Sequence, residues 1–154
     1  MTGWLIVRTD FRKEHYVAQQ IKALGFPCWV PSQIIVVRDC RGRRGTARAQ
    51  MQSIRELPIL PKRIFAAVPS WALLQGELDH IRHLVAVERD ADQRPVSVPD
   101  SQITAFRAEI DAVNTASLAL AQRAGRKQKA QWKSLHDALL ELIEGAKQTM
   151  EQAA

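Results

Sequence analysis

Short apolar runs rich in β-branched residues recur along the first two thirds of this chain, and they constrain its fold more than any other feature. Runs this short, bounded by polar or turn residues, are typical of buried strands. The expected strands cover residues 4–7, residues 26–30 with a continuation at 33–38, residues 64–68 and residues 84–87. A sheet layer is therefore expected.

Segments with helical spacing separate and follow these runs. A helix is expected over residues 12–24, with Asp10 as its N-cap and Gly25 as its left-handed end. Its apolar face holds Val17, Ile21 and Leu24. A short helix capped by Ser70 should end near residue 81, and a longer one should run from residue 100 to about 124. The whole order describes an α+β fold, a sheet with helices on it.

Two parts of the chain interrupt this pattern. Residues 48–57 have no clean period, and Pro58 and Pro61 argue against a central strand or a helix interior there. From residue 122 onward the chain has few β-branched residues and many strong helix formers. A second long helix is therefore expected from residue 126 to the end.

This last helix carries an apolar seam, which should pack on an apolar surface. The seam consists of Trp132, Leu135, Leu139, Leu142 and Ala146. One candidate partner is the preceding helix of the same chain, through Ile103, Phe106, Ile110 and Val113. The other is a second copy of the chain, which would make a homodimer.

Positive charge is concentrated in one segment. Residues 38–63 hold eight basic and two acidic residues, an excess equal to the formal net charge of +6 of the whole chain. Arginines next to Gly42 and Gly45 form a turn where the backbone can come close to phosphate. The basic residues of this tip are Arg38, Arg41, Arg43, Arg44 and Arg48. They predict contact with a nucleic-acid backbone, and the alternative is a solvated hairpin tip.

The sequence does not favour catalysis. Cys28 and Cys40 have no metal-ligand or disulfide spacing, and the four histidines are scattered. No nucleophile motif or phosphate-cradling loop is present, so neither an enzyme nor a cofactor is expected. The chain has no apolar run of membrane-spanning length and no leader pattern, so we expect a cytoplasmic protein.

Several stretches, in order, resemble the N-terminal domain of the NusG/RfaH family of transcription elongation factors. The opening Trp4-Leu5-Ile6-Val7 is similar to the family's W-Y-x-V strand, and residues 25–31 to its G-F-x-x-F-V-P strand. Residues 58–65 resemble P-L-F-P-G-Y-V-F, with Lys62-Arg63 in place of Gly-Tyr. Residues 94–103 resemble the approach to the domain's last helix.

The resemblance implies an antiparallel sheet flanked by helices, with the domain at residues 1–115 and a helical extension at 116–154. It also implies that the domain binds the clamp helices of the largest subunit of RNA polymerase and contacts the non-template DNA strand. The matching polymerase-binding patch is Arg8, Leu60, Pro61, Arg63 and Phe65. The alternative for Leu60 and Phe65 is a plain core position. By the same analogy, Arg12, Lys13 and Arg82 extend the nucleic-acid track.

The tail departs from the typical family member, which continues into a small β-barrel, the KOW domain. The composition of residues 122–154 cannot build a barrel, and the helices can instead lie over the polymerase site, as a helical hairpin does in RfaH-like members. The expected function is transcription elongation or antitermination. The alternative is a basic nucleic-acid-binding module that acts without polymerase.

Overall fold

An antiparallel sheet forms the centre of the molecule. The computed structural model describes residues 3–39, 51–68, 76, 80–119 and 126–152. The sheet has the order β2-β5-β1-β6, and β7 pairs with the first half of β1 on the same side as β6. Its strands are β1 (Gly3–Thr9), β2 (Cys28–Trp29), β5 (Arg63–Ala67), β6 (Leu84–Val87) and β7 (Ser97–Pro99).

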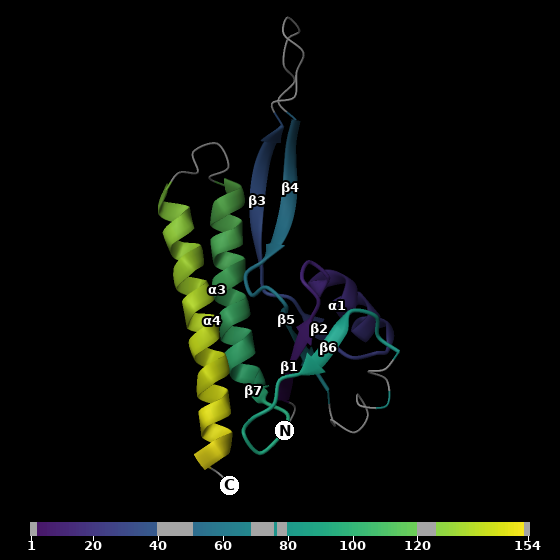
Figure 1. Ribbon diagram of the computed structural model, residues 1–154. Coiled ribbons are helices and arrows are strands. Elements are labelled where there is room, and N and C mark those ends of the chain that lie inside the picture. The colour runs from purple at the N-terminus through teal and green to yellow at the C-terminus, as the bar shows by residue number, and fades with distance from the viewer. Residues whose placement is uncertain (1–2, 40–50, 69–75, 77–79, 120–125, 153–154) are drawn as a thin grey trace, which may run out of the picture.

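Strand β1 is apolar without interruption because both faces of the sheet are covered. Trp4 and Ile6 point into one core, and Leu5 and Val7 point into the other, as the two-residue period of a strand requires. Helix α1 (Glu14–Ala23) covers the second face, where Val17 and its neighbours are buried. Helices α3 (Asp100–Ala119) and α4 (Arg126–Gln152) lie over the first face, side by side (Figure 1). The predicted α+β fold with helices flanking an antiparallel sheet is confirmed.

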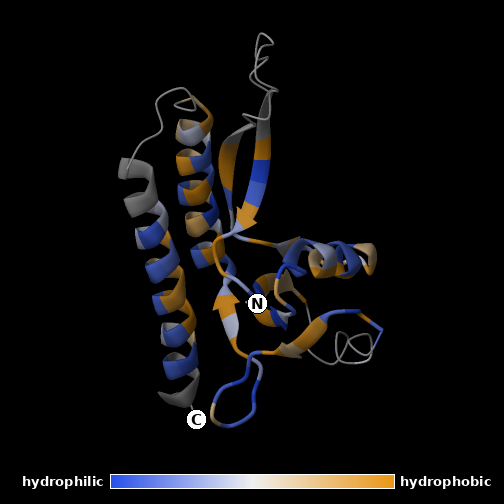
Figure 2. Ribbon diagram, turned by 45° about the horizontal axis from the view of Figure 1, so that its top comes forward, coloured by the Kyte–Doolittle hydropathy of each residue, from blue (hydrophilic) through white to orange (hydrophobic). Residues whose placement is uncertain are grey.

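The tail helix forms as predicted and packs within its own chain. Leu135 and Leu139 of the predicted seam are buried in the same core as Ile103 and Ile110 of α3. Figure 2 shows apolar residues of α4 on the side that faces α3 and the sheet. The seam is rotated slightly from the prediction, since Ile143 is fully buried and Leu142 only partly so. The proposed division at residues 115 and 116 falls inside α3, which continues without a break to Ala119.

A separate two-stranded sheet projects from the body. Strands β3 (Ser32–Asp39) and β4 (Met51–Pro58) pair only with each other among the described residues, and Figure 1 shows them extending beside α3. Residues 33–38 form a strand as predicted, but in a different sheet from β2, so the expected continuation of that strand was wrong. The strand that begins at Met51 was missed, because residues 48–57 show no clean period. Pro58 is compatible with β4 because it is the last residue of the strand, in a sheet that has only edge strands.

The ends of α1 and one other segment differ in part from what the sequence predicts. Asp10 does not cap α1, since Lys13 is the N-cap residue, without a side-chain hydrogen bond, and the Asp10 carboxylate instead lies 2.9 Å from Nδ1 of His83. Gly25 ends the helix with a φ of 89°, as predicted, but Leu24 is 41% exposed rather than buried. The strand β7 was not expected. The helix predicted after Ser70 lies mostly outside the described residues.

Candidate functional site

The turn before β5 presents part of the predicted polymerase-binding patch at the surface. Pro61 and Lys62 are exposed, and the N–H of Arg63 donates to the carbonyl of Leu60 at 3.3 Å, which closes the turn. Lys62 has a φ of 66°, the left-handed conformation that a type II turn requires at this position. The lysine that replaces the glycine of the resembling motif therefore keeps a glycine-like backbone.

Two other segments hold this turn in place. The buried Glu14, in the first turn of α1, accepts a hydrogen bond from the N–H of Lys62 through Oε1 at 2.8 Å. The carbonyl of Lys62 accepts one from the N–H of Thr9, at the end of β1, at 2.9 Å. Both backbone polar groups of the strained residue are thus satisfied, which stabilises its unfavourable φ.

Arg8 and Arg63 lie directly opposite each other on the paired strands β1 and β5. Residues in such a cross-strand pair project from the same face of a sheet. Arg8 is exposed, whereas Arg63 is half-buried and donates from Nε to Oε1 of Glu88 at 3.0 Å. The two arginines of the predicted rim therefore lie side by side next to the turn, and Arg63 is already paired with Glu88.

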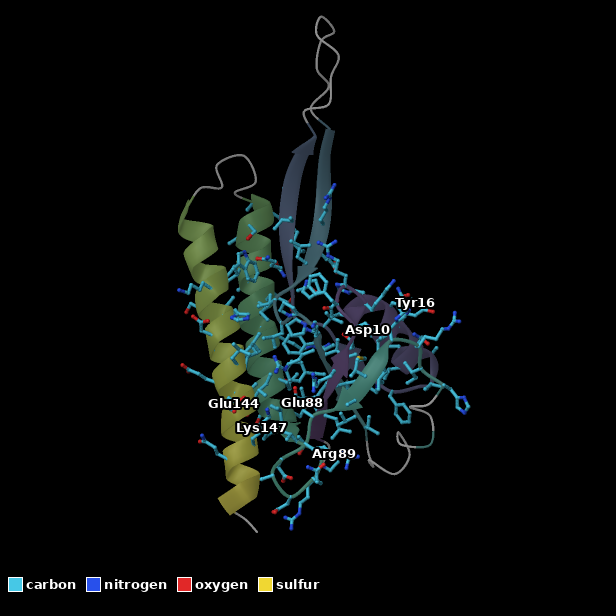
Figure 3. The ribbon with its side chains drawn as sticks, in the orientation of Figure 1. Asp10, Tyr16, Glu88, Arg89, Glu144 and Lys147 are labelled. Carbon is cyan, nitrogen blue, oxygen red and sulfur yellow. The ribbon has the colours of Figure 1, made fainter. Side chains whose placement is uncertain are left out.

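Glu88 connects this rim to the C-terminal helix. Its carboxylate lies 3.3 Å from Nζ of Lys147 on α4, in addition to its bond with Arg63, and Figure 3 shows Glu88 and Lys147 together. Burial acts to raise the pKa of Glu88, but the hydrogen bond from Arg63 and the charge of Lys147 outweigh it and lower the pKa. The carboxylate is therefore ionised at neutral pH and holds α4 against the sheet.

Leu60 and Phe65, the predicted apolar centre of the patch, have no exposed surface. The Phe65 ring stacks on Trp29 with centroids 5.4 Å apart, and both predicted residues belong to the core that contains Leu139 and Ile143 of α4. In this arrangement they act as core residues, and a partner can reach them only if the covering helices move. Their place in the core was not visible from the motif, because the covering residues Leu139 and Ile143 come 74 or more positions later in the chain.

The basic residues predicted to extend the nucleic-acid track lie in two neighbouring loops. Arg12 and Lys13 precede α1, and Arg82 precedes β6, all three with exposed side chains. The loops are joined because Gln20 on α1 exchanges two hydrogen bonds of 3.2 Å with the backbone of Arg82. The Asp10 N–H also donates to the His83 carbonyl at 2.9 Å. The structure thus brings these three cations to one end of the sheet.

Two exposed aromatic residues accompany these cations, and the sequence analysis did not single them out. Phe11 is 56% exposed with the Arg12 guanidinium 5.2 Å from its ring centre, and Tyr16 is 45% exposed with its ring edge-on to His83 at 5.6 Å. Basic side chains next to exposed rings are typical of surfaces that bind single-stranded nucleic acid. The signal that could have found them is the position of both rings at the polar start of a helix.

The predicted basic tip is described only at its base. Arg38 lies in β3 opposite Gln52 of β4. Arg41, Arg43, Arg44 and Arg48 lie outside the described residues. Their role as a nucleic-acid contact stays a prediction.

The described residues contain no group of three or more histidine, cysteine, aspartate or glutamate side chains that could hold a metal ion. Burial raises the pKa of the Cys28 thiol to about 12, so this thiol is protonated at neutral pH and is a poor nucleophile. In the part of the chain that the structure describes, no helix is long and apolar enough to cross a membrane.

One comparison with known proteins gives a clear result. The family model described as NusG, transcription termination factor nusG, matches residues 2–107. This range takes in the whole central sheet, α1, the β3–β4 hairpin and the first turns of α3. A search of curated proteins found no match.

Proposed function

The chain belongs to the NusG family, and from this membership we propose that it binds RNA polymerase and modulates elongation or antitermination in the cytoplasm. The family's role is transcription elongation, carried out without chemistry of its own, so the protein is a transcription factor and not an enzyme. The proposal concerns the contacts by which this chain would act: the clamp helices of the polymerase, the non-template DNA strand, and the C-terminal helix.

The observation that carries the polymerase contact is the position of α4. Its apolar seam packs into the core that contains Leu60 and Phe65, beside the exposed Pro61 turn and Arg8. An amphipathic helix lying on an apolar surface with a charged rim is how one protein commonly binds a helix of another. We therefore propose that α4 occupies the place of the clamp helices, and that polymerase binds when α4 leaves.

The proposed DNA contact rests on charge and on shape. The β3–β4 hairpin extends away from the body (Figure 1), and the predicted basic residues 41–48 come between its two strands in the sequence. Arg12, Lys13 and Arg82 add a second basic surface at one end of the sheet, next to Phe11 and Tyr16. Phosphate contacts of this kind position a protein on DNA without reading its sequence.

A direct test compares polymerase binding by the full chain and by a chain that lacks residues 126–154. If α4 competes with polymerase, the shortened chain should bind more tightly while retaining the circular dichroism of the sheet. In the full chain, Arg8→Glu should weaken binding several-fold, because rim charges steer association. Arg94→Glu, an exposed arginine in the loop before β7, is the matched control. Equal affinity of the two arginine variants would contradict the proposed patch.

The second candidate is a nucleic-acid-binding module that does not act on polymerase, and the exposed rings of Phe11 and Tyr16 beside basic residues favour it. Free DNA binding should weaken steeply with salt, and polymerase docking should weaken less. Neutralising Arg43 and Arg44 should lower the salt slope on duplex DNA by about 2. A slope equal to that of the wild type would show that the tip is merely solvated.

A homodimer through α4 is the remaining proposal for partners. Because the seam of α4 is already buried against its own α3, such a dimer would require the two copies to exchange their α4 helices. Sedimentation at increasing concentration would reveal it.

A further inference from the structure

Asn114 on α3 makes two hydrogen bonds to the backbone of β3. Its Oδ1 accepts from the N–H of Ile34 at 2.7 Å, and its Nδ2 donates to the carbonyl of Ser32 at 3.0 Å. The side chain is buried, with 9% of its surface exposed, and it reaches a strand some 80 residues earlier in the chain. A buried amide with a donor and an acceptor both satisfied by one strand is a specific link and not incidental packing.

The two backbone groups that Asn114 binds belong to the outer edge of the hairpin. Strand β3 pairs with β4 on one side, and among the described residues no strand pairs with it on the other. An open edge presents unpaired N–H and C=O groups in alternation. The carboxamide of Asn114 supplies one acceptor and one donor to the same strand, so it takes the place of the C=O and the N–H of one residue in a neighbouring strand.

The rest of the hairpin extends beyond this link as a lever. From Ile34 to Asp39, the strand advances by about 17 Å at roughly 3.3 Å per residue. A tilt of about 10° at the link would then move the far end of β3 by about 3 Å, more than the range over which a hydrogen bond to phosphate persists. Figures 1 and 2 show the hairpin alongside α3, the helix that carries Asn114.

We propose that Asn114 is the positioning residue that sets the direction in which the β3–β4 hairpin projects from α3. The importance of this direction for DNA rests on the function proposed above, whereas the positioning itself is a property of the free protein. The test therefore uses neither polymerase nor DNA, so its failure is distinct from a failure of the proposed function.

Spin labels on the hairpin and on the start of α3 measure this direction. Ile54 is 63% exposed on β4, and Ser101 is exposed about 20 Å from Asn114 along the helix axis, at 1.5 Å per residue. The labelled protein carries Ile54→Cys, Ser101→Cys and Cys40→Ser, while the buried Cys28 is retained. Pulsed electron resonance then gives the distribution of distances between the two labels.

Asn114→Leu keeps the approximate shape of the side chain and removes both hydrogen bonds, so it should widen this distribution at least twofold. Asn114→Asp keeps the acceptor for the Ile34 N–H and should give an intermediate width. Thr115→Ala is the control, because the Thr115 hydroxyl bonds to the Asp111 carbonyl within α3, and it should leave the width unchanged. A leucine variant with the wild-type width would overturn the proposal.

Hydrogen exchange in the wild-type protein tests the same link without a substitution, in case the leucine variant does not fold. The amide of Ile34 should exchange at least tenfold more slowly than that of Val36, the next outward-facing amide of β3, because only Ile34 donates to Asn114. Equal or faster exchange at Ile34 would overturn the proposal.

Discussion

The packing of α4 predicts a large stability loss when Leu139 is shortened. Leu139 has no exposed surface and lies in the core shared by α3, α4 and the sheet. Replacing a fully buried leucine with alanine costs about 2–5 kcal/mol, since the lost transfer free energy adds to the cost of the cavity. For a protein of this size, each kcal/mol lowers the melting temperature by roughly 2–4 °C. We therefore expect Leu139→Ala to melt about 10 °C below the wild type.

The assay is thermal and urea unfolding followed by circular dichroism and tryptophan fluorescence, with Glu141→Ala as the control. Glu141 is exposed on the same helix, and its replacement should change the free energy of unfolding by no more than about 0.5 kcal/mol. If Leu139→Ala lost less than about 1 kcal/mol, the tight packing of α4 on the core would be wrong.

The same substitution tests the competition between α4 and polymerase. If undocking of α4 became easier by about 2 kcal/mol, the population with a free patch would rise about 30-fold, and so would polymerase affinity while that population stays small. Unchanged affinity, in a variant shown to have a destabilised α4, would refute the idea that α4 covers the contact.

Three further predictions concern single residues. The pKa of Glu88 is lower in the folded protein than its unfolded value near 4.5, so its ion pairs stabilise the protein fully above that pH, and this stability is lost as the pH falls through the folded pKa. The advantage of wild type over Glu88→Gln in the free energy of unfolding should therefore shrink as the pH falls below 4.5, and a constant difference would contradict this. Lys62→Gly should stabilise the protein by about 0.5 kcal/mol in urea unfolding, because glycine adopts the positive φ at little cost, and a loss would show that the turn is unstrained. Gly25→Ala should cost about 1 kcal/mol in the same assay, because the added carbon would meet no atom within 4 Å beyond its chain neighbours and only the φ of 89° opposes it. An unchanged midpoint would argue against backbone strain.

The sequence predicted best those elements whose burial produces a regular local pattern of apolar residues. Strand β1 is buried on both faces and α4 on one, so an uninterrupted apolar run and a three-to-four spacing were sufficient signals. Strand β4 gave no such signal because the hairpin covers little of its surface, and Ile54 and Leu57 remain exposed. Strand β3, the partner of β4, was also misassigned. It follows the short β2 after only two residues, and the hydrophobic pattern does not show that the chain passes from one sheet to another there.

The candidate site was predictable only where the motif itself is exposed. The Pro61 turn and Arg8 lie at the surface as expected, but no local pattern shows whether an apolar residue next to a turn is covered by a later helix. Glu88 and Asn114 escaped notice for a related reason. Each is an unremarkable polar residue in the sequence, and each gains its role from partners distant in the chain.

These distant contacts would link a release of α4 to the exposure of the proposed polymerase patch. Glu88 holds Arg63, a residue of the predicted patch, and also Lys147 of α4. A partner that engages the Arg63 guanidinium with its own carboxylate would compete with Glu88, and a partner helix that enters the apolar core would displace Leu139. If Arg63 leaves, Glu88 loses the hydrogen bond that most lowers its pKa, and Lys147 alone must offset its burial. The ion pairs of Glu88 and the apolar packing of α4 should therefore be lost together. A ligand that disrupts only one of them would gain little binding free energy.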